Sequence, residues 1–136
     1  MLGDKIGEDS GKITSQKVLP PDGANPQFEA TYQGSGKILG ADMTVMITYS
    51  SVVMPDGTLR GEGRGVLLTS TGGRVNVKGE GIGRFTGHGP NAVSWRGNQY
   101  YVTASGPLER LNSVVAVFEY EIDNDGNVKG TIWEWK

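Results

Sequence analysis

The residues of this chain that could carry acid–base chemistry are two glutamates, one arginine and one histidine. Glu62 and Glu80 stand on two neighbouring glycine-rich segments, so they could act together as a general acid and a general base. Arg96 could stabilise negative charge that develops on a substrate. His88 is the only histidine and stands in the loop Gly-His-Gly-Pro at 87–90, where a base could reach a barrel mouth. Glu80, Arg96 and His88 are therefore the candidate catalytic residues.

Each candidate also has a structural interpretation. Glu62 and Glu80 could form a salt-bridged outer surface with Arg64 and Arg84, and a single histidine in a loop is usually solvated. In the inverted arrangement, the charged row would face inward and line a polar cavity for an anionic substrate. Burying several unpaired charges is costly, so the sequence favours the charged row on the outside.

Cofactor and metal sites are not predicted. The segment 7–14 resembles a phosphate-binding loop, but three residues separate its glycines where four are needed. The segment 123–127 carries oxygen side chains at alternate positions, but Val128 stands where a calcium loop requires glycine. With no cysteine and one histidine, the chain also lacks the usual zinc ligands. We therefore expect no cofactor and no metal.

Length and charge favour one domain without polyanionic partners. The chain of 136 residues can bury a core of its own, so 1–136 is expected to fold as a unit. The 13 Lys and Arg against 15 Asp and Glu leave a net charge of −2, which disfavours nucleic acid and anionic membranes. Residues 1–10 are acidic and glycine-rich, unlike a signal peptide, and are expected to form a flexible extension of a cytoplasmic protein.

Turn residues divide the rest of the chain into segments of strand length, most of them rich in Val, Ile, Thr, Tyr or Trp. The segments lie near 11–19, 27–38, 43–54, 58–70, 74–86, 92–104, 113–123 and 127–135. Only 107–112 suggests a helix, of a single turn. Short loops favour an antiparallel meander, which eight strands are enough to close. The sequence predicts an all-β protein with very little helix: a single antiparallel eight-stranded up-and-down barrel, with a two-sheet β-sandwich as the alternative.

Glycine occupies alternate positions on two successive segments, at 57, 61, 63 and 65 and at 79, 81, 83 and 87. Successive residues of a strand face opposite sides, so each segment has one face almost bare of side chains. If 71–73 forms the hairpin loop, Gly65 faces Gly79 and Arg64 faces Glu80. The glycine face is expected inside, because it also carries Leu59, Leu67, Val75, Val77, Phe85 and Val93.

Aromatic side chains are the candidate walls of an apolar cavity above this bare strip. They are Tyr32, Tyr49, Phe85, Trp95, Tyr101 and Phe118, with Tyr120 on the same face as Phe118. Their other interpretation is an ordinary filled core. Trp133 and Trp135 share a face that would either seal the barrel or meet another subunit.

The glycine-rich stretch at 79–89, with its Gly-x-Gly-x-Phe rhythm, resembles the barrels of the allene oxide cyclase and dirigent type. The Gly-Glu-Gly-Arg-Gly segment at 61–65 fits the neighbouring strand of such a barrel. The resemblance implies a closed barrel with a hydrophobic lumen, often in a homo-oligomer. No catalytic residue of those families aligns with a position here, so their chemistry is not implied. The chain looks more like a small bacterial relative than a plant enzyme.

Three functions remain open from the sequence. The first is a module that binds a small, mostly apolar molecule in the lumen. The second is a cofactor-free isomerase or cyclase that uses a charged residue in the lumen. The third is a structural, oligomer-forming protein without a ligand. An apolar cavity favours binding, an inward charged residue beside it favours catalysis, and a filled interior with exposed tryptophans favours assembly.

Overall fold

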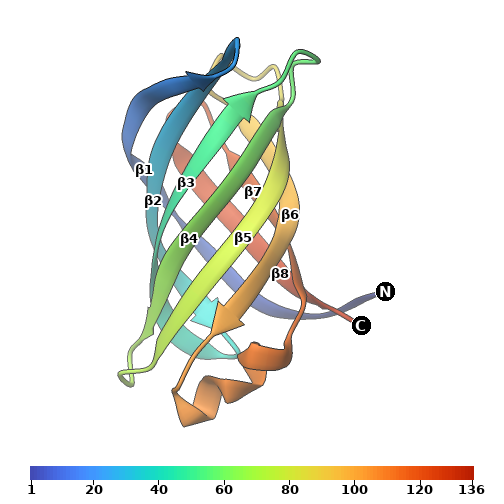
Figure 1. Cartoon of the computed structure of the whole chain (residues 1–136). Helices are drawn as coiled ribbons and strands as arrows, with labels where there is room; N and C mark the ends of the chain where they lie inside the picture. The colour runs from blue at the N-terminus through green and yellow to red at the C-terminus, as the bar shows by residue number, and fades with distance from the viewer.

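The computed structural model describes residues 1–136 as one closed antiparallel barrel (Figure 1). Its elements are β1 (Leu2–Asp22), β2 (Asn25–Ile38), β3 (Ala41–Val53), β4 (Leu59–Thr69), β5 (Arg74–Phe85), β6 (Val93–Val102), the 3-10 helix η1 (Gly106–Ser113), β7 (Ala116–Ile122) and β8 (Asn127–Trp135). Each strand pairs with the next, and β1 pairs with β8. The predicted up-and-down barrel is confirmed, and the sandwich alternative is wrong because all eight strands belong to one closed sheet.

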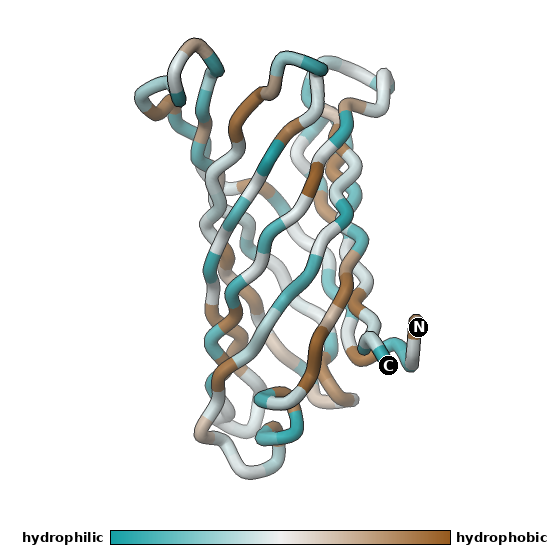
Figure 2. Tube along the Cα trace, turned by 45° about the vertical axis from the view of Figure 1, so that its right-hand side comes forward, coloured by the Kyte–Doolittle hydropathy of each residue, from teal (hydrophilic) through white to brown (hydrophobic).

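Alternation of residue type separates the two faces of the barrel wall. Hydrophobic and hydrophilic positions alternate along the strands in Figure 2. On β4 and β5, Leu59, Leu67, Val75 and Val77 are buried, whereas the charged residues between the glycines are exposed. The glycine face therefore lies inside, because burying its apolar neighbours is favourable and the charges stay in water.

The helix η1 covers one end of the barrel, at the bottom of Figure 1. Leu108 and Leu111 are buried and belong to the same core cluster as Ile38 and Val75. The backbone N–H of Thr103 donates to Asn112 Oδ1 at 2.8 Å, and Asn112 Nδ2 donates to the Thr103 carbonyl at 2.9 Å. These contacts hold the helix against the end of β6. No helix in the structure is long and apolar enough to cross a membrane.

The N-terminal segment differs from its prediction as a flexible extension. From Leu2 onward it belongs to β1, which pairs with β8 from Leu2 to Lys12 and with β2 from Gly7 onward. Register shifts near Lys5 interrupt the simple alternation of this strand. The segment is ordered because it provides the hydrogen bonds that both neighbouring strands need to close the barrel.

The register of β4 and β5 also differs from its prediction by two residues. Gly63 pairs with Gly79, and Glu62 pairs with Glu80, instead of Gly65 with Gly79 and Arg64 with Glu80. The loop is the reason: the N–H of Thr69 bonds to the Gly73 carbonyl at 2.9 Å, and Gly72 adopts a φ of 88°. The turn therefore occupies 70–72, with glycine at its left-handed position. A shift of two residues preserves which face is bare.

Candidate functional site

The bare faces of β4 and β5 form one wall of a cavity inside the barrel. The cavity has a volume of about 90 Å³. Its wall includes Gly61 and Gly63 on β4 and Gly79 and Gly81 on β5. Glu62, Arg64 and Glu80, which alternate with the glycines, also border the cavity, although they are exposed. Eleven further residues add their side chains: Ile13, Tyr32, Ile47, Tyr49, Val77, Trp95, Gln99, Phe118, Tyr120, Ile122 and Val128. The glycines position these side chains, because they let aromatic rings approach the strand backbone closely.

Two glycines illustrate this close approach. A Cβ atom at position 61 would lie 2.7 Å from Cη2 of Trp95, and one at position 81 would lie 3.2 Å from Cζ of Phe118. The first distance is too short for any side chain without movement of the Trp95 ring. Alternate glycines thus set how far the rings of Trp95 and Phe118 extend across the lumen.

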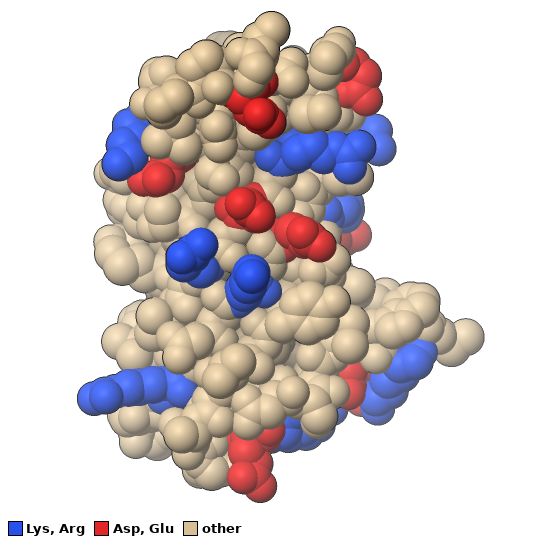
Figure 3. Space-filling view, in the orientation of Figure 1, with Lys and Arg blue, Asp and Glu red and all other residues tan.

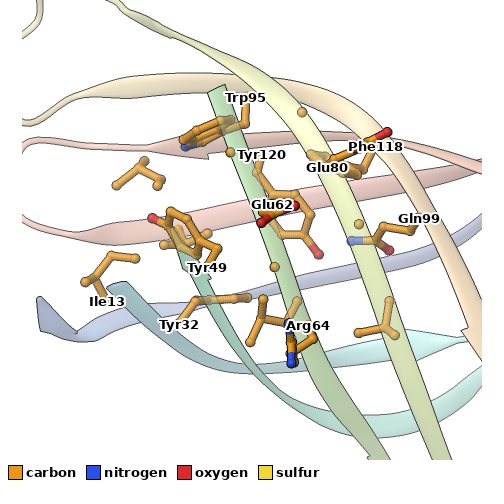
Figure 4. A pocket seen from close by; sticks show the side chains of 18 residues that line it. Ile13, Tyr32, Tyr49, Glu62, Arg64, Glu80, Trp95, Gln99, Phe118 and Tyr120 are labelled. Carbon is orange, nitrogen blue, oxygen red and sulfur yellow. The ribbon is translucent and has the colours of Figure 1, made fainter. Parts of the chain in front are cut away.

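Aromatic rings pack edge to face around the cavity (Figure 4). The ring centroids of Tyr49 and Trp95 are 5.9 Å apart, and those of Phe118 and Tyr120 are 5.2 Å apart. Tyr32 packs against Tyr120 at 6.0 Å. This arrangement is favourable for rings and fixes their orientation. The aromatic walls of the cavity are therefore held in place by packing between the rings.

A buried carboxylate lies beside this aromatic group. Asp9 on β1 is 5% exposed. The hydroxyl of Tyr32 donates to Asp9 Oδ1 at 2.6 Å, and the hydroxyl of Tyr120 donates to Asp9 Oδ2 at 2.9 Å. Each carboxylate oxygen thus accepts one hydrogen bond from a tyrosine that lines the cavity. The two donors offset part of the cost of burying the carboxyl group.

Burial shifts the titration of the whole cluster. Desolvation raises the pKa of Asp9 above its ordinary value, although the hydrogen bonds from Tyr32 and Tyr120 act in the opposite direction. Desolvation and the nearby Asp9 charge also raise the pKa of Tyr32 and of Tyr120. The tyrosines consequently stay protonated at neutral pH and act as hydrogen-bond donors.

Two further polar groups face the lumen. The hydroxyl of Tyr101 donates to Gln99 Oε1 at 2.8 Å, and both residues are buried. With that oxygen occupied, the amide nitrogen of Gln99 makes no hydrogen bond within the protein and points toward the cavity (Figure 4). The hydroxyl of Tyr49 has no protein partner either, and burial raises the pKa of this tyrosine to about 12. The cavity is therefore apolar with a few hydrogen-bond donors.

Some of the aromatic residues predicted to form the cavity walls line the cavity, and others do not. Tyr32, Tyr49, Trp95 and Phe118 line the cavity, as does Tyr120. Tyr101 is buried beyond the lining and reaches it only through Gln99. Phe85 does not line the cavity, because it ends β5 near the barrel rim and is 48% exposed. The tryptophans of β8 lie outside: Trp135 is exposed and Trp133 is half-buried.

The predicted catalytic candidates do not meet in the lumen. Glu80 borders the cavity but is exposed, because it stands between the inward Gly79 and Gly81. Arg96 also points outward, where it pairs with Glu119 at 3.3 Å and with Glu121 at 2.9 Å. His88 is exposed in the β5–β6 loop, away from the cavity. Asp9 is the buried acidic group next to the cavity, which it reaches through its hydrogen bonds with Tyr32 and Tyr120 without lining it.

Sequence reasoning missed Asp9 and Gln99. The inward positions of β1 from Gly7 to Ile13 are every second residue, so Asp9 shares a face with Gly11 and Ile13. This alternation is the signal that could have indicated an inward Asp9. It is weak, because the row is short and two of its residues are glycines. Gln99 falls between Gly97 and Tyr101 on the face of Trp95, a polar residue in an otherwise apolar row.

Comparisons with known proteins support the fold alone. No protein-family model and no curated protein matches the sequence. Similar solved structures include a protein with unknown function from Clostridium acetobutylicum, with a TM-score of 0.83, 15% identity, and coverage of 98% of this chain and 97% of that one. A beta-barrel like protein from Acinetobacter baumannii has a TM-score of 0.83 and 14% identity, with coverage of 100% and 96%.

An enzyme from Penicillium herquei has a more distant likeness, with a TM-score of 0.67 and 18% identity over 98% of this chain and 96% of that one. None of these structures is described as an allene oxide cyclase or a dirigent protein. The chain therefore shares a whole-length barrel architecture with them.

Proposed function

We propose that the lumen binds a small, mostly apolar, uncharged molecule that carries a hydrogen-bond acceptor. The observation that carries this proposal is the apolar cavity between the glycine strip and the aromatic rings, with unpaired donors at its wall. Sites for small molecules are typically concave and apolar, with a few polar groups that fix orientation. The resemblance of 79–89 to allene oxide cyclase and dirigent barrels agrees with such a use of the lumen.

The size of the cavity limits the ligand. Its volume of about 90 Å³ is smaller than the roughly 300–1,000 Å³ of sites for drug-sized molecules. An engineered apolar cavity of about 150 Å³ accommodates benzene. The lumen is smaller than that cavity, so we expect a ligand no larger than a small ring, or a longer one that extends past the half-buried Ile13 and Ile122.

The polar groups limit its chemistry. The free amide nitrogen of Gln99 and the hydroxyl of Tyr49 can donate to a carbonyl, ether or hydroxyl oxygen. An anionic ligand is disfavoured, because it would enter a site of low polarity next to Asp9. The matching ligand is a neutral oxygenated compound whose remaining surface is apolar.

A second candidate function is cofactor-free catalysis of proton transfer, as in an isomerase or cyclase. Asp9 favours it, because a buried carboxyl group with a raised pKa, bonded to two tyrosine hydroxyls at a cavity, suits general acid–base chemistry. The cluster could accept a proton from one substrate atom and return it to another, with no net gain or loss. This role belongs to Asp9, Tyr32 and Tyr120 in place of Glu80, Arg96 and His88.

The first test is native mass spectrometry of the purified protein beside the same sample denatured. A reproducible extra mass that is lost on denaturation supports lumen binding and gives the compound class. Neutral ring compounds with one oxygen can then be titrated while the fluorescence of Trp95 is followed, in a variant with Trp133→Phe and Trp135→Phe. Because Trp95 lines the cavity, occupancy should change its emission.

Two variants separate the lumen from non-specific binding. Ile122→Phe should fill part of the cavity and weaken binding without adding a tryptophan, whereas Tyr100→Phe, on the exposed outer face of β6, should leave affinity unchanged. Equal binding by wild type and Ile122→Phe would refute the lumen as the site. Turnover of a bound compound that is lost in Asp9→Asn, with its affinity retained, would favour the catalytic candidate.

A further inference from the structure

The outer face of β4 and β5 carries two rows of like charges. Glu62 pairs directly with Glu80 across the two strands, and the next outward row pairs Arg64 with Lys78. All four side chains are exposed, and none forms an ion pair within the protein. Like charges directly opposite each other are unfavourable in a sheet. Figure 3 shows acidic side chains beside basic ones near the middle of this face.

Exposed apolar residues adjoin the basic row. Met46 on β3 pairs with Val66 on β4, Val66 pairs with Asn76 on β5, and Asn76 pairs with Val102 on β6. Of these, Met46, Val66 and Val102 are exposed hydrophobic side chains. Tyr100, also exposed, continues the basic row on β6. An apolar row therefore borders a band of unpaired charge on this face.

We propose that this outer face binds a second copy of the chain around a two-fold axis. An axis in the contact plane, parallel to the rows and midway between them, exchanges the glutamate row with the basic row. Glu62 then faces Arg64 of the second copy, and Glu80 faces Lys78 of the second copy. Such a contact is self-complementary, as a two-fold interface must be, and it gives every like-charged pair an opposite partner.

Charge pairing favours this face over another exposed apolar patch. That patch lies at the chain ends, where Leu2 pairs with Trp135 and Val115 is exposed nearby. Its charged neighbours already have partners: Arg110 pairs with Glu134, and Lys136 lies 3.8 Å from Asp4. Only the β4–β5 face presents an acidic row and a basic row whose side chains have no ion-pair partners. The surface that complements both rows is the same surface rotated by half a turn.

The test is sedimentation velocity over a concentration series, supported by native mass spectrometry. Wild type should dimerise, with affinity that falls as salt is added. E62K/E80K makes the band wholly positive, and R64E/K78E makes it wholly negative. Because like charges would face each other across the contact, each variant alone should lose affinity by about tenfold or more. An equimolar mixture of the two should recover a dimer that contains one copy of each.

The controls separate this contact from its alternatives. E109K/D125K changes the net charge by the same amount as E62K/E80K, at exposed sites outside β4 and β5, and should dimerise like wild type. Trp135→Glu should also leave the dimer intact, and circular dichroism checks that every variant is folded. The proposal is overturned by a monomeric wild type, by a mixture without the mixed dimer, or by loss of the dimer in Trp135→Glu alone. None of these outcomes depends on a lumen ligand.

Discussion

The hydroxyl of Tyr120 lies 2.9 Å from the carboxylate of Asp9, although 111 positions separate the two residues in the chain. Tyr32 supplies the second hydroxyl from another strand. Three strands thus place one carboxyl group and two phenols at a single point inside the barrel.

Removing the Asp9 carboxyl group should destabilise the fold. In Asp9→Ala, the buried hydroxyls of Tyr32 and Tyr120 lose their acceptor, and each unpaired group costs about 1–3 kcal/mol. Asp9→Asn retains an acceptor oxygen and should lose less. Urea unfolding measures both free energies. Asp125→Ala, at an exposed loop position, is the control and should stay within about 0.5 kcal/mol of wild type. An Asp9→Ala variant as stable as this control would show that the cluster does not stabilise the fold.

Asp9 should make the protein less stable as pH rises. Its pKa is raised in the folded state, so the folded protein binds this proton more tightly than the unfolded chain does. The favourable contribution is complete below the unfolded pKa and is lost as pH rises through the folded pKa. The difference in unfolding free energy between wild type and Asp9→Asn, measured from acid to neutral pH, isolates this effect from the surface carboxylates. A flat difference, or one that grows in favour of wild type with pH, would contradict the raised pKa.

A methyl group at Gly61 should disturb the lumen. Its Cβ would lie 2.7 Å from the Trp95 ring, so Gly61→Ala must displace that ring. Overpacking of this kind typically costs about 1–3 kcal/mol, and Trp95 fluorescence should change with it. Gly106→Ala is the matched control, because a Cβ there meets nothing within 4 Å. If both alanine variants behave alike, close approach is not the reason for the glycine at position 61.

The outward charges should be dispensable for the lumen. Arg96 forms exposed ion pairs with Glu119 and Glu121, and such pairs contribute about 0–1 kcal/mol. Arg96→Gln and Glu80→Gln should therefore leave ligand affinity and any turnover unchanged, as measured by the Trp95 titration and by product formation. A large loss of turnover in either variant would restore these residues as catalytic candidates.

The architecture was readable from the sequence because its signals repeat in every strand. Alternation of apolar and polar residues, with turn residues at short intervals, fixes both the strand number and the inward face. Register is a finer property. Shifting the loop from 71–73 to 70–72 moves every β4–β5 pair by two positions without changing which face is bare. The apolar pattern therefore fits both registers, and the cross-strand charges favour the predicted register over the observed one.

The site was harder to predict than the fold. The aromatic walls at Tyr32, Tyr49, Trp95 and Phe118 stand in clear inward rows. Asp9 stands in an acidic, glycine-rich segment whose local composition is typical of a flexible end. Only pairing with β2 and β8, which are distant in sequence, turns that segment into a wall of the lumen. The composition of a segment does not predict its pairing with strands that are distant in the sequence.

The pairing of β1 with β8 has a consequence for synthesis of the protein. A nascent chain cannot complete the barrel until Asn127–Trp135 has emerged from the ribosome, because β1, the first strand, pairs with β8, the last. Until then β1 and β7 each present an open edge of backbone groups, which favours aggregation. Early termination or proteolysis near the carboxyl end would therefore expose both edges at once. A chain that lacks β8 would consequently behave as a misfolded protein in the cell.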